Sequence, residues 1–152
     1  IAYISFRFEL KFALGGVIAL VHDIIIAIGV IALLGYEINS SFIAAILTIL
    51  GYSINDTIVV YDRIRENLKR HKGLSLENII DNSVNDVMRR SLNTSFTTLL
   101  AVLAVLIFGG DTLKSFMVTL LVGIGIGTYS SIFVASPVVY LLEGKLKSKI
   151  KL

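Results

Sequence analysis

Long apolar stretches are the feature that most constrains how this chain can fold. Four segments, 12–34, 42–61, 91–108 and 115–142, each hold about 20 or more mostly apolar residues, enough to cross a hydrocarbon core of about 30 Å as an α-helix. The chain is 55% hydrophobic with a mean hydropathy of +0.84, which is too apolar for 152 residues to hide in one soluble core. We therefore expect an all-α, polytopic transmembrane helix bundle whose last span tilts or kinks at Pro137.

The start of the sequence also carries information. It has no initiating Met and no basic, apolar and small-residue series typical of a signal peptide, so we expect a fragment in which residues 1–6 are the end of an earlier span. The absence of Cys excludes disulfides and cysteine metal sites. We expect neither a metal nor a cofactor.

The distribution of charge predicts the orientation of the spans. Connections 35–40 and 109–114 are short enough for tight helical hairpins and share one side, whereas 13 of the 14 Lys and Arg residues, all except Lys114, fall on the other side. The positive-inside rule then makes the connection 63–90 and the basic tail 143–152 cytoplasmic. Because topology explains these charges and membrane lipid surrounds the spans, nucleic acid is not expected as a partner.

The polar connection between the second and third spans has a helical pattern. Glu66 and Arg70 are four residues apart, which extends the second span as a helix until Gly73. Ser75 can then cap a cytoplasmic amphipathic helix that runs toward residue 90. That helix either lies at the membrane surface, packs against the ends of the spans or binds a partner.

Carboxylic acids inside two neighbouring spans are the first candidates for function. Asp56 lies in the second span within a polar cluster of Ser53, Asn55 and Thr57. An ionised carboxylate at membrane depth costs roughly 2.5–3.5 kcal/mol even on lenient insertion scales, so such a residue usually faces a polar interior and marks an ion or proton path.

The first span brings a second acid to the same depth, as the pair His22 and Asp23. Against lipid these groups would be costly, so we expect them to face inward, where a carboxyl group can take up and release protons. A purely structural role, as hydrogen bonds between helices, stays open for this pair.

A polar stripe and a small-residue stripe mark the last two spans. Arg90, Thr94 and Thr98 repeat at i, i+4 and i+8 in the third span, where Arg90 can pair with Asp56 or simply anchor the helix end. In the fourth span Gly123, Gly127 and Ser131 recur every four residues and allow another helix to approach closely. The string GIGIG lacks the preceding strand of a dinucleotide loop.

Several strings together resemble a known family. They are FRFE, HDIII, GYSINDTIVVYDRIREN, RSLNTSFTTLL and IGTYSSIFVASP, and they cover essentially the whole chain. They closely resemble SecF, the smaller partner of SecD in bacterial protein export, or the SecF half of a fused SecDF chain. This family is similar to one half of an RND-type transporter.

The resemblance implies an accessory subunit, not an enzyme, in the bacterial cytoplasmic (inner) membrane. With SecD it would use the proton motive force to promote preprotein translocation after the SecYEG channel and the SecA motor have acted. It implicates Asp56 and Arg90 in proton passage and leaves Asp23 and His22 as helpers. The extracytoplasmic domain that handles preproteins would be absent from this fragment.

Three alternatives stay open. An RND-type exporter of small molecules or lipids would share the fold, and a scaffold that stabilises SecD would not require intramembrane acids. An intramembrane aspartyl protease is disfavoured: Tyr61 and Asp62 supply its first motif, but the Gly-x-Gly-Asp motif is replaced by FGGD at 108–111, in a turn.

Overall fold

Four long antiparallel helices make up the fold in the computed structural model, which describes residues 10–71 and 73–142. They are α2 (Leu10–Leu33), α3 (Ser40–Arg70), α4 (Leu76–Phe108) and α5 (Asp111–Ser130), and α5 continues through a π-helical segment, η1 (Ser131–Ala135), into further α-helix up to residue 142. Each of the four predicted spans coincides with one of these helices, apart from residue 34, which follows the end of α2, and all four helices are long and apolar enough to cross a membrane. The prediction of an all-α transmembrane bundle is confirmed.

The helices begin and end at residues with capping chemistry. The Asn39 side chain accepts a hydrogen bond from the backbone N–H of Phe42 at 3.1 Å and starts α3. Ser75 starts α4 as predicted, accepting from the N–H of Asn78 at 3.4 Å. Between α4 and α5, Gly110 has a φ of +78°, a left-handed conformation that favours glycine. The connections thus fix two tight hairpins.

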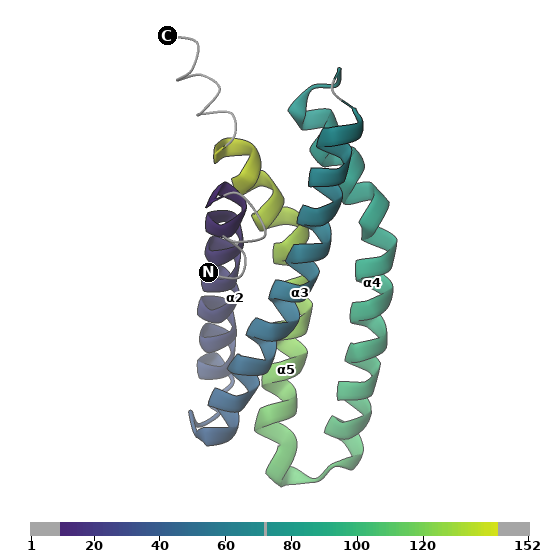
Figure 1. The fold of residues 1–152 in the computed structure, drawn as a ribbon. Helices are drawn as coiled ribbons and strands as arrows, with labels where there is room; N and C mark the ends of the chain where they lie inside the picture. The colour runs from purple at the N-terminus through teal and green to yellow at the C-terminus, as the bar shows by residue number, and fades with distance from the viewer. Residues whose placement is uncertain (1–9, 72, 143–152) are drawn as a thin grey trace.

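Helix α5 with η1 occupies the centre of the bundle. It contacts α2, α3 and α4, and Figure 1 shows α2 and α4 on opposite sides of the α3 and α5 pair. In the helix from Asp111 to Leu142, half of the residues in its apolar 18-residue stretch are buried, compared with 17% in the corresponding stretch of α4. Large apolar side chains such as Leu33 and Phe108 are instead more than four-fifths exposed. Such a surface suits lipid, and the chain is a multi-pass membrane protein.

Two apolar clusters hold the helices together. One lies near the charged end and is built from the buried residues Phe12, Ala13, Ala19, Val60, Tyr61, Ile64, Ile80, Val87, Ala135 and Val139. The other lies toward the hairpin end and contains Ala45, Ile49, Val102, Leu120 and Ile124. Both clusters bring together α3, α4 and the helix that begins at Asp111, so these helices form a continuous packed unit.

The stretch after the second span differs from one of the sequence expectations. No separate surface helix is present in the described residues, because α4 runs unbroken from Leu76 to Phe108. The apolar face of its first turns, with Ile80 and Val87, packs into the cluster that contains Tyr61 and Ile64. The expected alternative of packing against the ends of the spans matches this arrangement. Residues 1–6 and the tail 143–152 lie outside the described residues.

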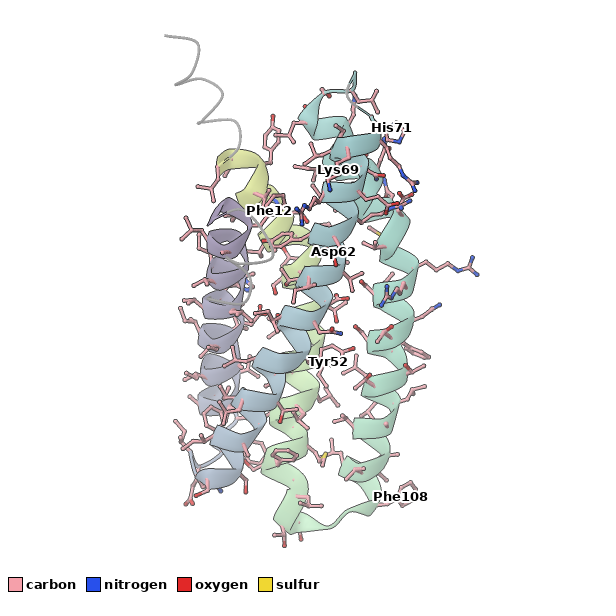
Figure 2. All side chains as sticks on the ribbon, in the orientation of Figure 1. Phe12, Tyr52, Asp62, Lys69, His71 and Phe108 are labelled. Carbon is pink, nitrogen blue, oxygen red and sulfur yellow. The ribbon has the colours of Figure 1, made fainter. Side chains whose placement is uncertain are left out.

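The described basic residues of these helices, apart from Lys114, lie toward one end of the bundle. Figure 2 shows Lys69 and His71 at the end where α3 stops, and Phe108 at the opposite end. Lys114 lies in the first turns of α5, beside the α4–α5 hairpin. The chain order of the helices therefore places the described basic residues as the charge pattern predicts.

An irregular turn marks the last helix, where the sequence predicts a tilt or kink. Pro137 has no N–H to donate, and in an α-helix its ring would clash with the carbonyl of Phe133. The helix is π-helical from Ser131 to Ala135, just before this proline. The Tyr61 hydroxyl of α3 donates to the carbonyl of Ala135 at 3.3 Å and so binds this segment from outside. Single π-helical turns of this kind are frequent at functional sites.

Candidate functional site

Asp23 is a fully buried carboxylate at the meeting point of three helices. Its Oδ2 accepts hydrogen bonds from the hydroxyls of Ser53 on α3, at 2.6 Å, and of Ser130 on α5, at 2.8 Å. Its Oδ1 lies 3.0 Å from Nδ1 of His22, whose side chain is 31% exposed. Burial of a carboxyl group is costly unless it is hydrogen-bonded, and these three contacts meet that requirement.

Asp56 is a second carboxylate, half-buried and held in a similar way. The hydroxyl of Ser91 on α4 donates to its Oδ1 at 2.7 Å, and that of Ser131 in η1 donates to its Oδ2 at 2.8 Å. Each oxygen therefore accepts from a different helix. Both intramembrane acids thus face other helices, as the sequence predicts, and each bridges three segments.

The two carboxylate sites are joined through neighbouring residues. Ser130 binds Asp23 and Ser131 binds Asp56, at the point where α5 gives way to η1. Consecutive helical residues point about 100° apart, so one helix can serve acids on two sides. A hydroxyl both donates and accepts, so it can pair with a carboxyl group in its ionised or protonated form. The serine hydroxyls can therefore hydrogen-bond either form of the two acids.

A third polar contact lies nearby and contains only hydroxyls. Tyr52 on α3 donates to Ser95 on α4 at 3.2 Å, and Ser95 shares a hydrogen bond with Thr128 on α5. Thr128 also bonds the carbonyl of Ile124 in its own helix. Together with the two acids, this contact places polar groups in the part of the α3, α4 and α5 interface that lies between the two apolar clusters.

The predicted stripe on α4 turns out to face away from this seam. Arg90 and Thr94 are exposed, and Thr94 and Thr98 donate at 2.9 Å to the carbonyls of Arg90 and Thr94 in their own helix. Within the described residues no ion pair joins Arg90 to Asp56, which is bound by Ser91 instead. Asn55 is also exposed, whereas Ser53 and Thr57 are buried.

Three serines with contacts to the polar seam were not predicted from the sequence. Ser91 and Ser95 have the same four-residue spacing as the predicted stripe, one position further along α4, and this spacing is the signal that could have identified them. Ser130 precedes Ser131, which the pattern assigned to helix packing alone. Its pairing with Asp23 joins residues 107 positions apart and leaves no local signal.

The small residues of α5 allow the close approach on which these contacts depend. A Cβ added to Gly123 would overlap the Ile49 side chain on α3, and one added to Gly127 would lie 3.1 Å from Cβ of Ser53. Gly125, on another face, has nothing within 4 Å. The geometry of Gly123 and Gly127 is therefore that of close packing between α3 and α5, which brings Ser130 and Ser131 within reach of the acids.

Ion pairs link the charged ends of α3 and α4. Arg63 contacts Asp86 across the helices and Glu66 on its own helix, both at 2.7 Å, while Arg70 contacts Glu66 at 2.8 Å. Hydrogen bonds from Arg63 hold the pKa values of the Glu66 and Asp86 carboxyls below their usual range, and those two carboxylates raise the pKa of Arg63. These side chains are partly exposed, so the stabilisation is modest.

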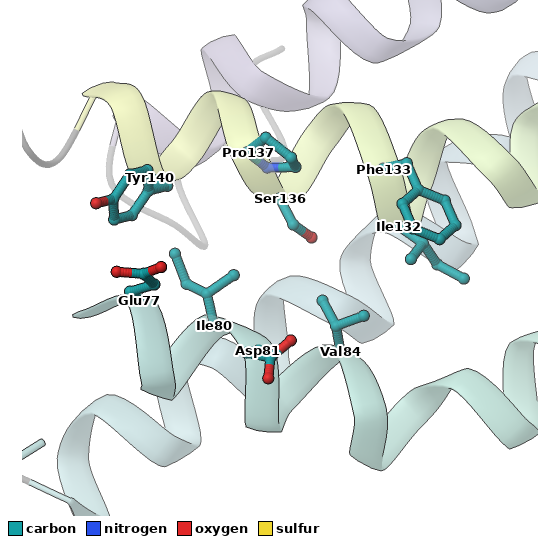
Figure 3. Close-up of a pocket in the computed structure, with 9 residues that line it drawn as sticks. All are labelled: Glu77, Ile80, Asp81, Val84, Ile132, Phe133, Ser136, Pro137 and Tyr140. Carbon is teal, nitrogen blue, oxygen red and sulfur yellow. The ribbon is translucent and has the colours of Figure 1, made fainter. Parts of the chain in front are cut away.

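Two surface grooves lie at the charged end, and neither includes Asp23 or Asp56. One has a volume of about 310 Å³ between the first turns of α4 and the helix that contains η1 (Figure 3), and it is lined by Glu77, Ile80, Asp81, Val84, Ile132, Phe133, Ser136, Pro137 and Tyr140. The other, of about 390 Å³, is lined by Val59, Asp62, Arg63, Glu66, Asp86, Val87 and Arg90. Arg90 thus borders the ion-pair groove.

Comparison with known proteins gives a consistent assignment. Residues 1–145 match the family described as protein export membrane protein SecD/SecF, C-terminal. The chain is 58% identical over 142 residues to protein translocase subunit SecF of Sebaldella termitidis, covering 93% of this chain and 46% of that protein. It is 51% identical over 139 residues to protein translocase subunit SecF of Petrotoga mobilis, covering 91% of this chain and 46% of that protein. The chain thus spans about half the length of these curated relatives.

Solved structures agree with this assignment at the level of the fold. A crystal structure of SecDF in a super-membrane-facing form is similar with a TM-score of 0.94 and 44% identity, over 99% of this chain and 20% of that one. A crystal structure of SecDF from Thermus thermophilus, described as a translocon-associated membrane protein, is similar with a TM-score of 0.90 and 45% identity. The similarity covers 94% of this chain and 20% of that one. The chain belongs to the SecD/SecF family of protein-export membrane proteins.

Proposed function

We propose that this chain is the transmembrane part of a SecF-type subunit that works with SecD in the bacterial cytoplasmic membrane. In this role it uses the proton motive force to promote export of preproteins, downstream of SecYEG and SecA. Its SecF relatives and the SecDF crystal structures that it resembles support the role and the partner. The one-sided distribution of Lys and Arg supports a cytoplasmic location for residues 63–90 and the C-terminal tail.

The observation that carries this proposal is the pair of intramembrane carboxylates held by serine hydroxyls. Asp56 connects α3 to α4 and η1, and Asp23 connects α2 to α3 and α5. A scaffold needs no such acids, because apolar or hydroxyl contacts alone hold helices together in lipid. Groups that gain and lose a proton, placed where helices meet, supply a means of coupling proton movement to helix packing.

The energy available from one proton is sufficient for such coupling. A charge that moves through about 150 mV releases roughly 3.5 kcal/mol, at about 2.3 kcal/mol per 100 mV. A difference of about 1.4 kcal/mol already changes a conformational ratio tenfold. One proton at Asp56 can therefore shift the bundle between two packings.

Protonation changes the hydrogen bonds that Asp56 can make. The ionised carboxylate only accepts, and it does so from Ser91 and Ser131. The protonated form must donate one hydrogen, so one of these hydroxyls turns and becomes an acceptor. The link between α4 and η1 is altered as a result. We assign Arg90 a supporting role from the exposed face of α4, and His22 a supporting role beside Asp23.

Proton flux through the assembled complex tests the proposal. We expect Asp56→Asn in SecDF reconstituted into vesicles to reduce proton flux to that of vesicles without protein, and to reduce export driven by the proton motive force. Asp111→Asn provides the matched control, since Asp111 is fully exposed at the α4–α5 hairpin. Normal flux and normal export in the Asp56 variant would refute a role in proton coupling and leave the scaffold role.

A further inference from the structure

Thr57 is a buried hydroxyl without a partner in the described part of the protein. The residue is 1% exposed. Two buried side-chain oxygens in the described part make no hydrogen bond: Oγ1 of Thr57 and Oγ of Ser115, at the start of α5. A polar group in this condition costs about 1–3 kcal/mol unless it binds something. In native proteins ordered water commonly fills that role.

Other threonines of the bundle satisfy their hydroxyls within their own helix. Thr48, Thr94, Thr98, Thr119 and Thr128 each donate to the carbonyl four residues earlier, at 2.7–2.9 Å. Thr57 does not make this bond, although it lies in the middle of α3. Its hydroxyl is therefore available to a ligand between the helices.

The neighbours of Thr57 on α3 define what it faces. Ser53 is one turn before it, binds Asp23 and packs against Gly127. Tyr61 is one turn after it and donates to the carbonyl of Ala135. A residue between these two on the same helix face lies opposite residues 128–134, the stretch in which α5 becomes π-helical.

Thr57 is close along α3 to residues of both carboxylate sites. Thr57 follows Asp56 in the sequence, and the hydroxyls of Ser53 and Ser131 belong to the Asp23 and Asp56 sites respectively. Each of those serines gives its hydrogen to a carboxylate and keeps lone pairs that can accept from another donor. A water molecule needs two to four polar partners, and Thr57 with these two serines offers three hydroxyls for that purpose.

We propose that Thr57 holds a buried water molecule at the contact of α3 with η1, and that this water relays protons between Asp56 and Asp23. The relay, though not the water site, rests on the function proposed above. The protonated Asp56 gives its proton to Ser131 Oγ, whose own hydrogen passes to the water. The water gives a hydrogen to Ser53 Oγ, and the Ser53 hydrogen passes to ionised Asp23. One proton is transferred, and each hydroxyl and the water regain what they lost.

The test uses Thr57→Val, which keeps the shape of the side chain and removes the hydroxyl, and Thr57→Ser, which keeps the hydroxyl. In SecDF vesicles we expect a several-fold loss of proton flux in the valine variant and its recovery in the serine variant. Thr48→Val is the matched control, because Thr48 lies exposed on the same helix and bonds its own backbone. Thermal unfolding of the same complexes reports whether they remain folded.

A structure of the complex at a resolution that reveals ordered water provides the second readout. We expect density within hydrogen-bonding distance of Thr57 Oγ1 that is lost in Thr57→Val. If that density is absent and the valine variant is more stable, Thr57 is only an unsatisfied hydroxyl and the proposal fails. If water is present but flux is normal, the relay is refuted. Failure of the proposed function would instead appear as normal flux in Asp56→Asn, whatever the density at Thr57.

Discussion

Replacing Gly123 with Ala tests how closely α5 packs against α3. An added Cβ would overlap Cδ1 and Cγ1 of Ile49 and lie 2.9 Å from its Cγ2. Ile49 is fully buried in the same apolar cluster as Ala45 and Leu120, so it can move only by repacking that cluster. Overpacking of this kind costs about 1–3 kcal/mol, whereas the better helix preference of Ala returns about 0.5–1 kcal/mol. We expect a net loss of about 1 kcal/mol.

The free energy of unfolding is measured by titrating the complex with SDS in mild detergent micelles. Gly125→Ala is the matched control on the same helix, since a Cβ there meets nothing within 4 Å. That change should leave the unfolding free energy unchanged or raise it by about 0.5–1 kcal/mol. The difference between the two variants isolates the packing of Gly123 from helix propensity.

A double-mutant cycle identifies the partner. Ile49→Ala removes all three atoms that the new methyl group would meet, and alone it should cost about 2–5 kcal/mol through the cavity it leaves. In the Gly123→Ala background it should cost less, because the methyl group then occupies part of that space. We expect a coupling of about 1 kcal/mol or more between the two changes. Equal effects of Gly123→Ala and Gly125→Ala, or strict additivity with Ile49→Ala, would refute the reasoning.

Two further predictions concern the ends of the helices. Arg63→Met removes the cation that lowers the pKa values of Glu66 and Asp86, and a lowered carboxyl pKa stabilises the fold above the ordinary values of about 4 and ceases to do so as pH falls through the folded values. The variant should therefore melt at a lower temperature than the parent at pH 7 and at nearly the same temperature near pH 2; a constant difference at both pH values would contradict this. Asn39→Ala removes the cap that binds the N–H of Phe42 and should cost about 1 kcal/mol of unfolding free energy, so an unchanged value in the SDS titration would show that this cap contributes nothing.

The fold could be predicted largely from the lengths of apolar sequence and the cap residues. A run of about 20 apolar residues has few alternatives to a transmembrane helix, since every backbone group must be satisfied within lipid. The inward position of Asp23 and Asp56 follows from the same physics, because a carboxylate against lipid is costly. These inferences depend on the solvent and not on tertiary detail.

The face that α4 presents to the bundle could not be predicted in this way. Thr94 and Ser95 are adjacent, and both carry a hydroxyl, so spacing alone does not distinguish the face of one from the face of the other. A threonine hydroxyl that bonds its own backbone, as that of Thr94 does, can face lipid at little cost. Only the packing of α4 against α3 and α5 decides that Ser91 and Ser95 lie inside. The continuity of α4 through residue 90 likewise depends on burial of its first turns.

The junction of α5 and η1 has a mechanical consequence. Two neighbouring serines of this helix bind the two acids, Ser130 binding Asp23 and Ser131 binding Asp56. By contrast, α2 and α4 each carry a side chain that contacts one acid alone. A rigid slide or rotation of this central helix therefore cannot lengthen the hydrogen bond to one acid without also changing the hydrogen bond to the other. Under the proposed function, a helix movement caused by protonation at one acid would change the proton affinity of the other, to the same extent in both directions.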